Sequence, residues 1–231
     1  MNFAWEPLGD GVTRCRLPFL DVTVGVVQGS SGTLLIDTGT TLIGAHAIDQ
    51  DVRNLTRRSV THIVLTHNHF DHILGSSAFA GAAVYSAPEV AATIADDTGH
   101  LRADAVRHGA NSDEVDRAIA ALRTPEHQVH DAVIDLGDRL VSITHPGRGH
   151  TDHDLIVAVG DQTRIIVFCG DLVEEPGDPV VDSDSDVAAW PSTLDRVVEA
   201  GGPDGVFVPG HGAVVDAAFV RRQQRWLLHQ V

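Results

Sequence analysis

The stretch Val64-Leu-Thr-His-Asn-His-Phe-Asp-His-Ile-Leu-Gly75 places three histidines and one aspartate within six residues, directly after an apolar run. The run His62–Thr66 is short and rich in β-branched and apolar residues, which is typical of a buried strand. Polar side chains at the end of such a strand lie where α/β folds present their functional groups. The stretch is therefore either a histidine-rich polar loop or one half of a metal site.

The residue types of this motif favour the metal site. Neutral imidazole and carboxylate groups are ligands that suit zinc, and also iron or manganese. A lone histidine is more often structural, but His67, His69, Asp71 and His72 are four ligand-type residues in six positions. Residues two apart in a tight loop can direct two nitrogens at one ion, and Asp71 and His72 can turn to a second ion nearby.

Three downstream segments supply the missing half of such a site. His150 lies in the glycine-rich turn Gly149-His150-Thr151 between two expected strands. Asp171 follows the expected strand Ile165–Cys169, and His211 follows the expected strand Val206–Val208. Each of these three residues is flanked by glycine, which lets the backbone approach closely.

Strand and helix patterns alternate along both halves of the chain, which predicts an α/β domain made of two sheet-plus-helix layers. No linker or internal repeat interrupts the pattern, so we expect one domain over residues 1–231. The predicted helices are Ile43–Arg57, Ile73–Phe79, a helical region from Pro88 to about Gly109 with a polar middle, Asp113–Leu122 after the N-cap Ser112, a helix from Pro191 to Gly201, and a closing helix capped by Asp216.

Composition excludes several classes of partner. The chain has 231 residues, 43% of them hydrophobic, and a formal charge of −16. All 16 basic residues are arginine, without a basic cluster, so neither nucleic acid nor a membrane surface is an expected partner. Cys15 and Cys169 form no metal-binding pair, and we see no secretory signal, so we expect a cytoplasmic protein acting on a small molecule.

The order H-x-H-x-D-H, then GHT, GD and PGHG, preceded by Ile36-Asp37-Thr38-Gly39, resembles the metallo-β-lactamase superfamily. The resemblance implies a four-layer αβ/βα sandwich with its metals in a groove at one edge of the two sheets. It also implies that Asp37 orients the ligands through hydrogen bonds. In that pattern one ion is held by His67, His69 and His150, a second by Asp71, His72 and His211, and Asp171 bridges the two.

The same resemblance implies a binuclear hydrolase. Two divalent ions, with zinc expected and iron or manganese as alternatives, would share a bridging hydroxide that attacks a carbonyl. The substrate would be a small-molecule thioester, ester, lactone or amide. The catalytic residues are expected to be Asp171, through its bridge, and Asp71, which would assist the leaving group.

Two other readings stay open. A mononuclear iron persulfide dioxygenase would need only His67, His150 and Asp171, and a non-catalytic member of the fold would bind metal without turnover. The full ligand set favours the hydrolase. β-Lactamase activity is disfavoured because the commonest zinc type has cysteine where this chain has Asp171, with a lysine nearby, and this chain has no lysine.

Several residues outside the motifs are candidates for contact with the substrate. Arg148 and His153 lie on either side of the turn Gly149-His150-Thr151, and the segment 95–109 is a candidate lid over the groove. The acidic run Asp182–Asp186 lacks the glycine and terminal glutamate of a calcium loop, so we interpret it as a solvated loop at the rim of the groove.

Overall fold

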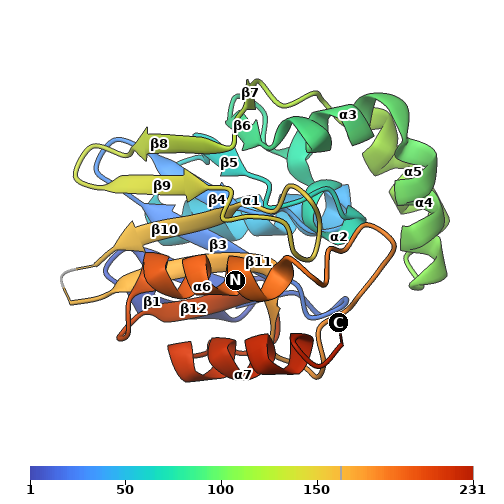
Figure 1. The fold of residues 1–231 in the computed structure, drawn as a ribbon. Helices are drawn as coiled ribbons and strands as arrows, with labels where there is room; N and C mark the ends of the chain where they lie inside the picture. Colours follow the sequence, from blue (N-terminus) through green and yellow to red (C-terminus); the bar gives the residue numbers. More distant parts are fainter. Residues whose placement is uncertain (162, 231) are drawn as a thin grey trace.

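Two β-sheets form the centre of the fold (Figure 1), in a computed structural model that describes residues 1–161 and 163–230. The first sheet has, in spatial order, β1 (Trp5–Gly9), β2 (Val12–Arg16), β3 (Thr23–Gln28), β4 (Thr33–Ile36), β5 (His62–Val64), β6 (Ala83–Ser86) and β7 (His127–Gln128). The second has β12 (Val206–His211), β11 (Ile165–Glu174), β10 (Ile156–Gly160), β9 (Leu140–Thr144) and β8 (Asp131–Asp135).

Helices cover the outer faces of both sheets, which gives the predicted four-layer αβ/βα sandwich (Figure 1). Helix α1 (Leu42–Thr56) lies against the first sheet, and α6 (Trp190–Gly201) and α7 (Ala217–Leu227) lie on the side of the second. A third group stands at one end of the sandwich: α2 (Phe70–Ile73), the 3₁₀ turn η1 (Ser76–Ala78), α3 (Pro88–Asp96), α4 (Thr98–Arg107) and α5 (Ser112–Ala121).

The two sheets pack closely because glycine stands opposite a large aromatic ring. A Cβ added to Gly25 of β3 would lie 2.4 Å from a ring carbon of Phe168 on β11. Any other residue at position 25 would therefore push the sheets apart. Outside the second sheet, α6 buries Leu194 and Val197, which are one helical turn apart, against Phe207.

The structure corrects three of the predicted boundaries. The predicted helix Ile73–Phe79 is replaced by α2, which begins at Phe70, and by η1. The predicted strand Ile165–Cys169 continues to Glu174, so Asp171 lies within β11. The predicted strand Val206–Val208 continues through His211, because β12 pairs with β11 as far as the pair Glu174–His211.

Other predicted helices agree with the structure, and one of them is α6, which spans Trp190–Gly201 where a helix from Pro191 to Gly201 was predicted. The helical region from Pro88 to Gly109 is two helices, α3 and α4, separated at Asp97. Among the described residues, no helix is both long and apolar enough to cross a bilayer. Gln162 and Val231 fall within the range predicted for the domain but lie outside the described residues.

Candidate metal centre

The histidine motif lies on the loop and short helix that follow β5. His67 and His69 are in the loop, and Asp71 and His72 are on the single turn of α2. His67 and His72 are completely buried and their ring centroids are 4.3 Å apart. Since α2 begins one residue after His69, its turn keeps His72 beside His67 while His72 Nε2 lies 3.3 Å from Asp171 Oδ1 of the second sheet.

The second sheet brings three more ligand-type residues to the same place. His150 comes from the loop between β9 and β10, Asp171 from β11 and His211 from the end of β12. The Asp171 Oδ2 atom lies 3.2 Å from His211 Nε2 and 3.5 Å from His150 Nε2. The seven residues form two groups, each with ligand atoms within 4.8 Å of one another: His67, His69, His150 and Asp171, and Asp71, His72 and His211.

Asp171 lies between the two groups. Its Oδ2 atom is 3.6 Å from His67 Nε2 in the first group, and its Oδ1 atom is 3.3 Å from His72 Nε2 in the second. The neighbouring strand leaves room for this carboxylate only because residue 210 is glycine. A Cβ added to Gly210 would lie 1.8 Å from Asp171 Oδ1, which is an impossible contact.

Asp37 orients two of the histidines, as predicted. Its carboxylate accepts from His72 Nδ1 at 2.8 Å and from Thr66 Oγ1 at 2.9 Å. Because the Thr66 hydroxyl donates to Asp37, it is free to accept from His67 Nδ1, which is 2.9 Å away. Both histidines therefore turn Nε2 toward the cluster. The backbone of Asp37 itself is in the left-handed conformation, with a φ of 59°.

Two further histidines are oriented by contacts that the sequence did not reveal. His69 directs Nε2 to Asp184 Oδ2, at 3.1 Å, and Nδ1 inward to within 3.0 Å of His150 Nε2. His211 Nδ1 donates to the carbonyl of Leu20 at 2.7 Å. Leu20 reaches this position in a left-handed conformation with φ of 56°, which is uncommon for a residue other than glycine.

Electrostatics couple Asp171 to the second group. Burial opposes the charged form of Asp171, but His211, His72 and His67 hold its pKa well below the usual value. Burial also opposes a charge on His211, yet Asp171 and then Asp71 raise its pKa to about 9. The pKa of His72 is raised well above its usual value by the same two carboxylates and by Asp37, against the effect of burial. Without metal, these histidines hold protons beside the carboxylates.

Two of the three histidines of the first group behave in the opposite way, whereas the pKa of His69 is raised by Asp184, Asp71 and Asp171 against the effect of burial. Burial lowers the pKa of His150 to about 4 and lowers the pKa of His67 well below its usual value. Both rings are therefore neutral at pH 7, the form in which imidazole binds metals. His67 Nε2 is buried and, among the described residues, has no hydrogen-bond partner. A buried nitrogen directed at other ligand atoms is accounted for by a bound ion.

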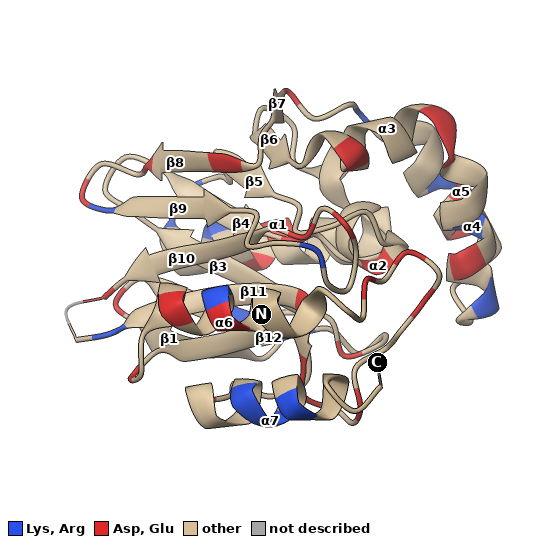
Figure 2. Cartoon of the chain, viewed as in Figure 1, with Lys and Arg blue, Asp and Glu red and all other residues tan. Residues whose placement is uncertain are grey.

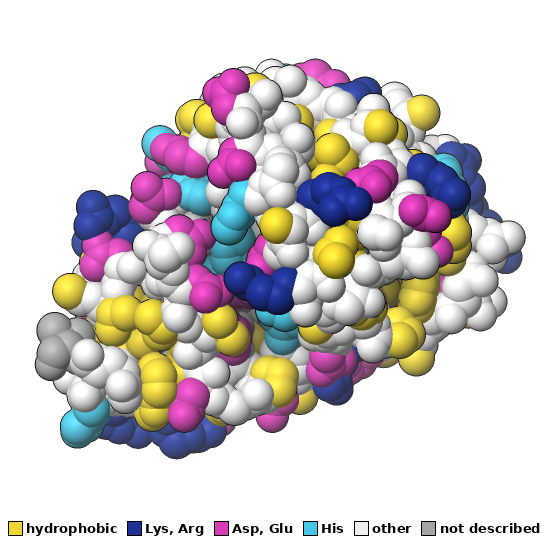
Figure 3. All heavy atoms as spheres, turned by 90° about the vertical axis from the view of Figure 1, so that its right-hand side faces the viewer, with side chains coloured by type: hydrophobic (Ala, Val, Ile, Leu, Met, Phe, Trp, Pro, Cys, Tyr) yellow, Lys and Arg dark blue, Asp and Glu magenta, His cyan; other side chains and the backbone are white. Residues whose placement is uncertain are grey.

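A groove of about 240 Å³ opens onto this cluster. Figure 3 shows histidine side chains in a hollow on this face, with acidic and hydrophobic side chains around it and a basic side chain beside it. Its rim comes from the hairpin after β2, the end of α4 and the loop after β11, where Figure 2 marks a series of acidic positions. Besides the ligand-type residues, it is lined by Leu20, Phe70, Asp104, His108, Glu174, Pro176, Val180 and Asp182.

The segments suggested as substrate contacts divide into two sets. Asp104 and His108 of the segment 95–109 line the groove, as does Asp182 of the acidic loop. Arg148 does not line it, because the guanidinium points outward and pairs with Asp186. His153 is buried beside Asp152, with its Nδ1 2.7 Å from that carboxylate, and is also outside the lining.

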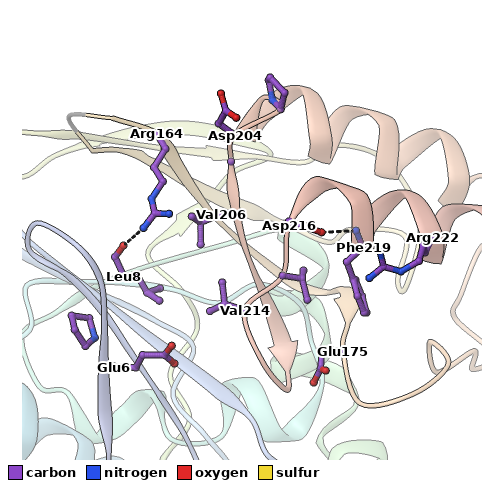
Figure 4. A pocket seen from close by; sticks show the side chains of 14 residues that line it. Glu6, Leu8, Arg164, Glu175, Asp204, Val206, Val214, Asp216, Phe219 and Arg222 are labelled. Atoms are coloured by element: carbon purple, nitrogen blue, oxygen red, sulfur yellow. Dashed lines mark hydrogen bonds between the residues drawn. The ribbon is translucent and has the colours of Figure 1, made fainter.

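A larger cavity of about 790 Å³ lies elsewhere, between β1, β12 and the start of α7 (Figure 4). Its Arg164 is held by the carbonyl of Leu8 at 3.2 Å, and Asp216 caps α7 by accepting from Phe219 N. Its lining contains no residue of either ligand group found among the described residues. The smaller groove is therefore the candidate site.

A profile of the metallo-β-lactamase superfamily matches residues 17–211, which include every residue of both groups. The chain belongs to the metallo-β-lactamase superfamily. Solved structures of members share its fold over nearly the whole chain. A metallo-β-lactamase from Pontibacter korlensis has a TM-score of 0.78 at 21% identity, with 99% of this chain and 100% of that one covered. A metallo-β-lactamase of Pseudomonas aeruginosa in a mono-zinc form has a TM-score of 0.75 at 17% identity, with 99% and 96% covered.

Two curated relatives are named for different activities. A type 2 metallo-β-lactamase of Bacteroides fragilis is 31% identical over 118 residues, 49% of this chain and 47% of the relative. The human acyl-coenzyme A thioesterase MBLAC2 is 26% identical over 197 residues, 74% of this chain and 66% of the relative. The chain thus matches about half of one relative and about two thirds of the other, and membership of the superfamily leaves the substrate open.

Proposed function

We propose that this chain is a metal-dependent hydrolase with two divalent ions, which cleaves a thioester, ester, lactone or amide bond in a small molecule. The observation that carries this proposal is the pair of ligand groups that meet at Asp171. We assign one ion to His67, His69 and His150, the other to Asp71, His72 and His211, and the bridge between them to Asp171.

The donor set fits zinc, and iron or manganese as alternatives. Five imidazoles and two carboxylates are nitrogen and oxygen donors, with no thiolate among them. Two divalent ions repel each other strongly when only a few ångströms apart, and an anionic bridge between them lowers that repulsion. Asp171, within 3.6 Å of histidine nitrogens of both groups, is the carboxylate in the position to do so.

When bound, two such ions supply a hydroxide nucleophile at neutral pH and polarise a carbonyl. The protein confines this reaction to a groove of limited size. Leu20, Phe70 and Val180 form apolar walls beside the ligands and restrict where the acyl part of a substrate can lie. Asp71 faces the groove within 3.4 Å of His211 Nε2, where its carboxylate would take up the proton that the attacking water or hydroxide gives up and pass it to the departing group.

The described lining of the groove has no lysine or arginine to pair with an anionic group next to the bond that is cleaved. In addition to the ligands, it contains Asp104, Glu174 and Asp182. Asp104 is paired with Arg107 at the rim, and burial together with Asp171 raises the pKa of Glu174 to about 8, so an anion is disfavoured by the missing basic partner and not by repulsion. A β-lactam antibiotic carries a carboxylate beside its ring, whereas the acyl and thiol parts of many thioesters are neutral. Between the activities named for the two relatives, we therefore favour hydrolysis of a thioester or a related neutral ester or lactone.

A mononuclear iron dioxygenase is the second candidate, because the three ligands it requires also lie together. His67 Nε2 and His150 Nε2 are 3.6 Å and 3.5 Å from Asp171 Oδ2. That enzyme would leave the second group without a function, which is why we place it second. From the composition we still expect a small molecule to be the only partner and the protein to be cytoplasmic.

Hydrolysis assays with matched substrates test the proposal. The purified protein, loaded with zinc, should hydrolyse neutral acyl thioesters or lactones, lose this activity after chelation and regain it with zinc. The Asp171→Ala variant should fall to background because it loses the bridge, while Asp152→Asn, which removes an exposed carboxylate outside the groove, should retain activity. Oxygen consumption by an iron-loaded protein without any hydrolysis would contradict the proposal.

A further inference from the structure

Four of the five clustered histidines have an oxygen next to the ring nitrogen that faces away from the cluster. For His67 it is Thr66 Oγ1, for His69 Asp184 Oδ2, for His72 Asp37 Oδ2, and for His211 the Leu20 carbonyl. Such contacts fix the tautomer and the orientation of a metal-binding imidazole. The fifth histidine, His150, has no such hydrogen bond among the described residues, and its Nδ1 is buried.

The position of His150 defines which nitrogen needs an acceptor. Its Nε2 is the inward atom, 3.0 Å from His69 Nδ1 and 3.5 Å from Asp171 Oδ2. The residue is 2% exposed, so water from the bulk does not reach its ring freely. A neutral imidazole that binds an ion through Nε2 carries its proton on Nδ1, and a buried N–H without an acceptor is costly.

One carboxylate is within reach of that nitrogen. Glu174 Oε1 lies 3.7 Å from His150 Nδ1, slightly beyond hydrogen-bond distance, and Glu174 is 7% exposed. We propose that Glu174 positions His150: it accepts the Nδ1–H and so presents Nε2 to the ion that His67 and His69 share. This inference rests on the proposed metal centre, and it gives a role to a buried acid that the superfamily motifs of this chain do not include.

Glu174 is itself held in place from two sides. Its backbone N–H donates to Gln223 Oε1 of α7 at 3.1 Å, and the Gln223 amide donates to the carbonyl of Leu172 at 2.7 Å. Its carboxylate also accepts from Val180 N, at 3.3 Å and 3.4 Å from the two oxygens. The same side chain thus connects a metal ligand to the loop that forms one wall of the groove.

Zinc affinity tests this role directly and does not depend on knowing the substrate. The Glu174→Gln variant keeps the size of the side chain and an acceptor for Val180 N but cannot ionise, and Glu174→Leu loses both the acceptor and the ionisable group. In the metal-free protein burial and Asp171 raise the pKa of Glu174 to about 8. We expect Glu174→Gln to weaken one of the two zinc-binding steps by about 10-fold and Glu174→Leu by up to about 100-fold, as measured against a chromophoric chelator. The His211→Ala variant identifies the step that belongs to the second group. That step should change less than the first in both Glu174 variants, because Glu174 pairs with His211 only through the strand register.

Asp182→Asn is the matched control, because it removes a carboxylate from the same groove without any contact to His150. Equal losses of zinc affinity in Glu174→Gln and Asp182→Asn would mean a general effect of removing a carboxylate from the groove, and they would overturn the inference. Nitrogen NMR of zinc-loaded wild type needs no variant: His150 should bear its proton on Nδ1, and a proton-free Nδ1 would also overturn it. A wild type without zinc affinity would overturn the metal centre itself, whereas tight binding that is insensitive to residue 174 would overturn only this role.

Discussion

Asp37 illustrates how a single residue outside the ligand set controls the candidate centre. It accepts hydrogen bonds from His72 and from Thr66, which in turn faces His67, so one carboxylate orients a histidine in each ligand group. Its backbone φ of 59° is a conformation that aspartate and asparagine adopt more readily than most residues. Substitution by asparagine therefore preserves the backbone and changes only the hydrogen bonding.

The Asp37→Asn variant should keep the fold and lose metal affinity. An amide cannot accept from both Thr66 and His72 with the strength of a carboxylate, and we expect zinc affinity to fall by about 10–100-fold. Zinc titration and thermal unfolding of the metal-free protein measure the two effects. Asp21→Asn is the matched control, because Asp21 has a φ of 60° but pairs with Arg16 on the surface. Unchanged zinc affinity in Asp37→Asn would contradict the role of Asp37.

All seven ligand-type residues were identifiable from sequence because their types and spacing are unusual, and the structure places them in two groups. Their supporting contacts were not identifiable. Asp184 is 115 residues from His69, and Leu20 acts through a backbone carbonyl, which any residue type could provide. Glu174 was visible only as part of the sequence after Asp171, because its proximity to His150 depends on the fold of the second sheet.

At the scale of elements, the close pairing of β11 with β12 determines where Asp171 can lie. Gly210 on β12 leaves the space that the Asp171 carboxylate occupies, and a Cβ there would be 1.8 Å from Oδ1. The Gly210→Ala variant should therefore displace Asp171 and lose zinc binding, with some loss of stability as the two strands separate. Metal content and thermal unfolding test this expectation.

Gly160→Ala provides the control for that variant. Gly160 ends β10 in the same sheet, and a Cβ added there would meet nothing within 4 Å. Zinc binding should be normal in Gly160→Ala. If Gly210→Ala bound two zinc ions as tightly as the wild type, the close approach of Gly210 to Asp171 would have no functional consequence.

The boundaries of elements were predicted less well than their existence. Asp171 and His211 were expected after strands, yet both lie within them, because the parallel pairing of β11 and β12 continues past the apolar residues that mark a strand in the sequence. β1 and β2 were not predicted, since their residues alternate irregularly between exposed and buried positions. Tertiary pairing, rather than local preference, decides these elements.

At the scale of the whole molecule, the balance of charge around the cluster predicts how metal binding depends on pH. The pKa of His211 is raised to about 9 and that of His72 is also raised, mainly by Asp171 against the effect of burial. These histidines must lose their protons before they can bind an ion. Zinc affinity of the second group should therefore increase as pH rises from 6 toward about 9, with release of protons at pH 7.

Calorimetric titration in buffers with different ionisation enthalpies measures those protons. The first group should show a weaker dependence on pH, because burial holds the pKa of His67 and His150 below neutrality and only the pKa of His69 is raised. Zinc binding without proton release at pH 7 would show that the histidines of the second group are neutral in the metal-free protein. It would contradict the electrostatic coupling to Asp171.

The number and identity of the ions that the purified chain retains test the central claim most directly. If each ligand group holds one ion and Asp171 joins them, elemental analysis after reconstitution with excess zinc and removal of free metal should find two zinc ions per chain. The His211→Ala variant, which lacks one ligand of the second group, should retain one. A wild-type chain that retains a single ion, whether iron or zinc, would contradict the binuclear centre and the hydrolytic function proposed from it.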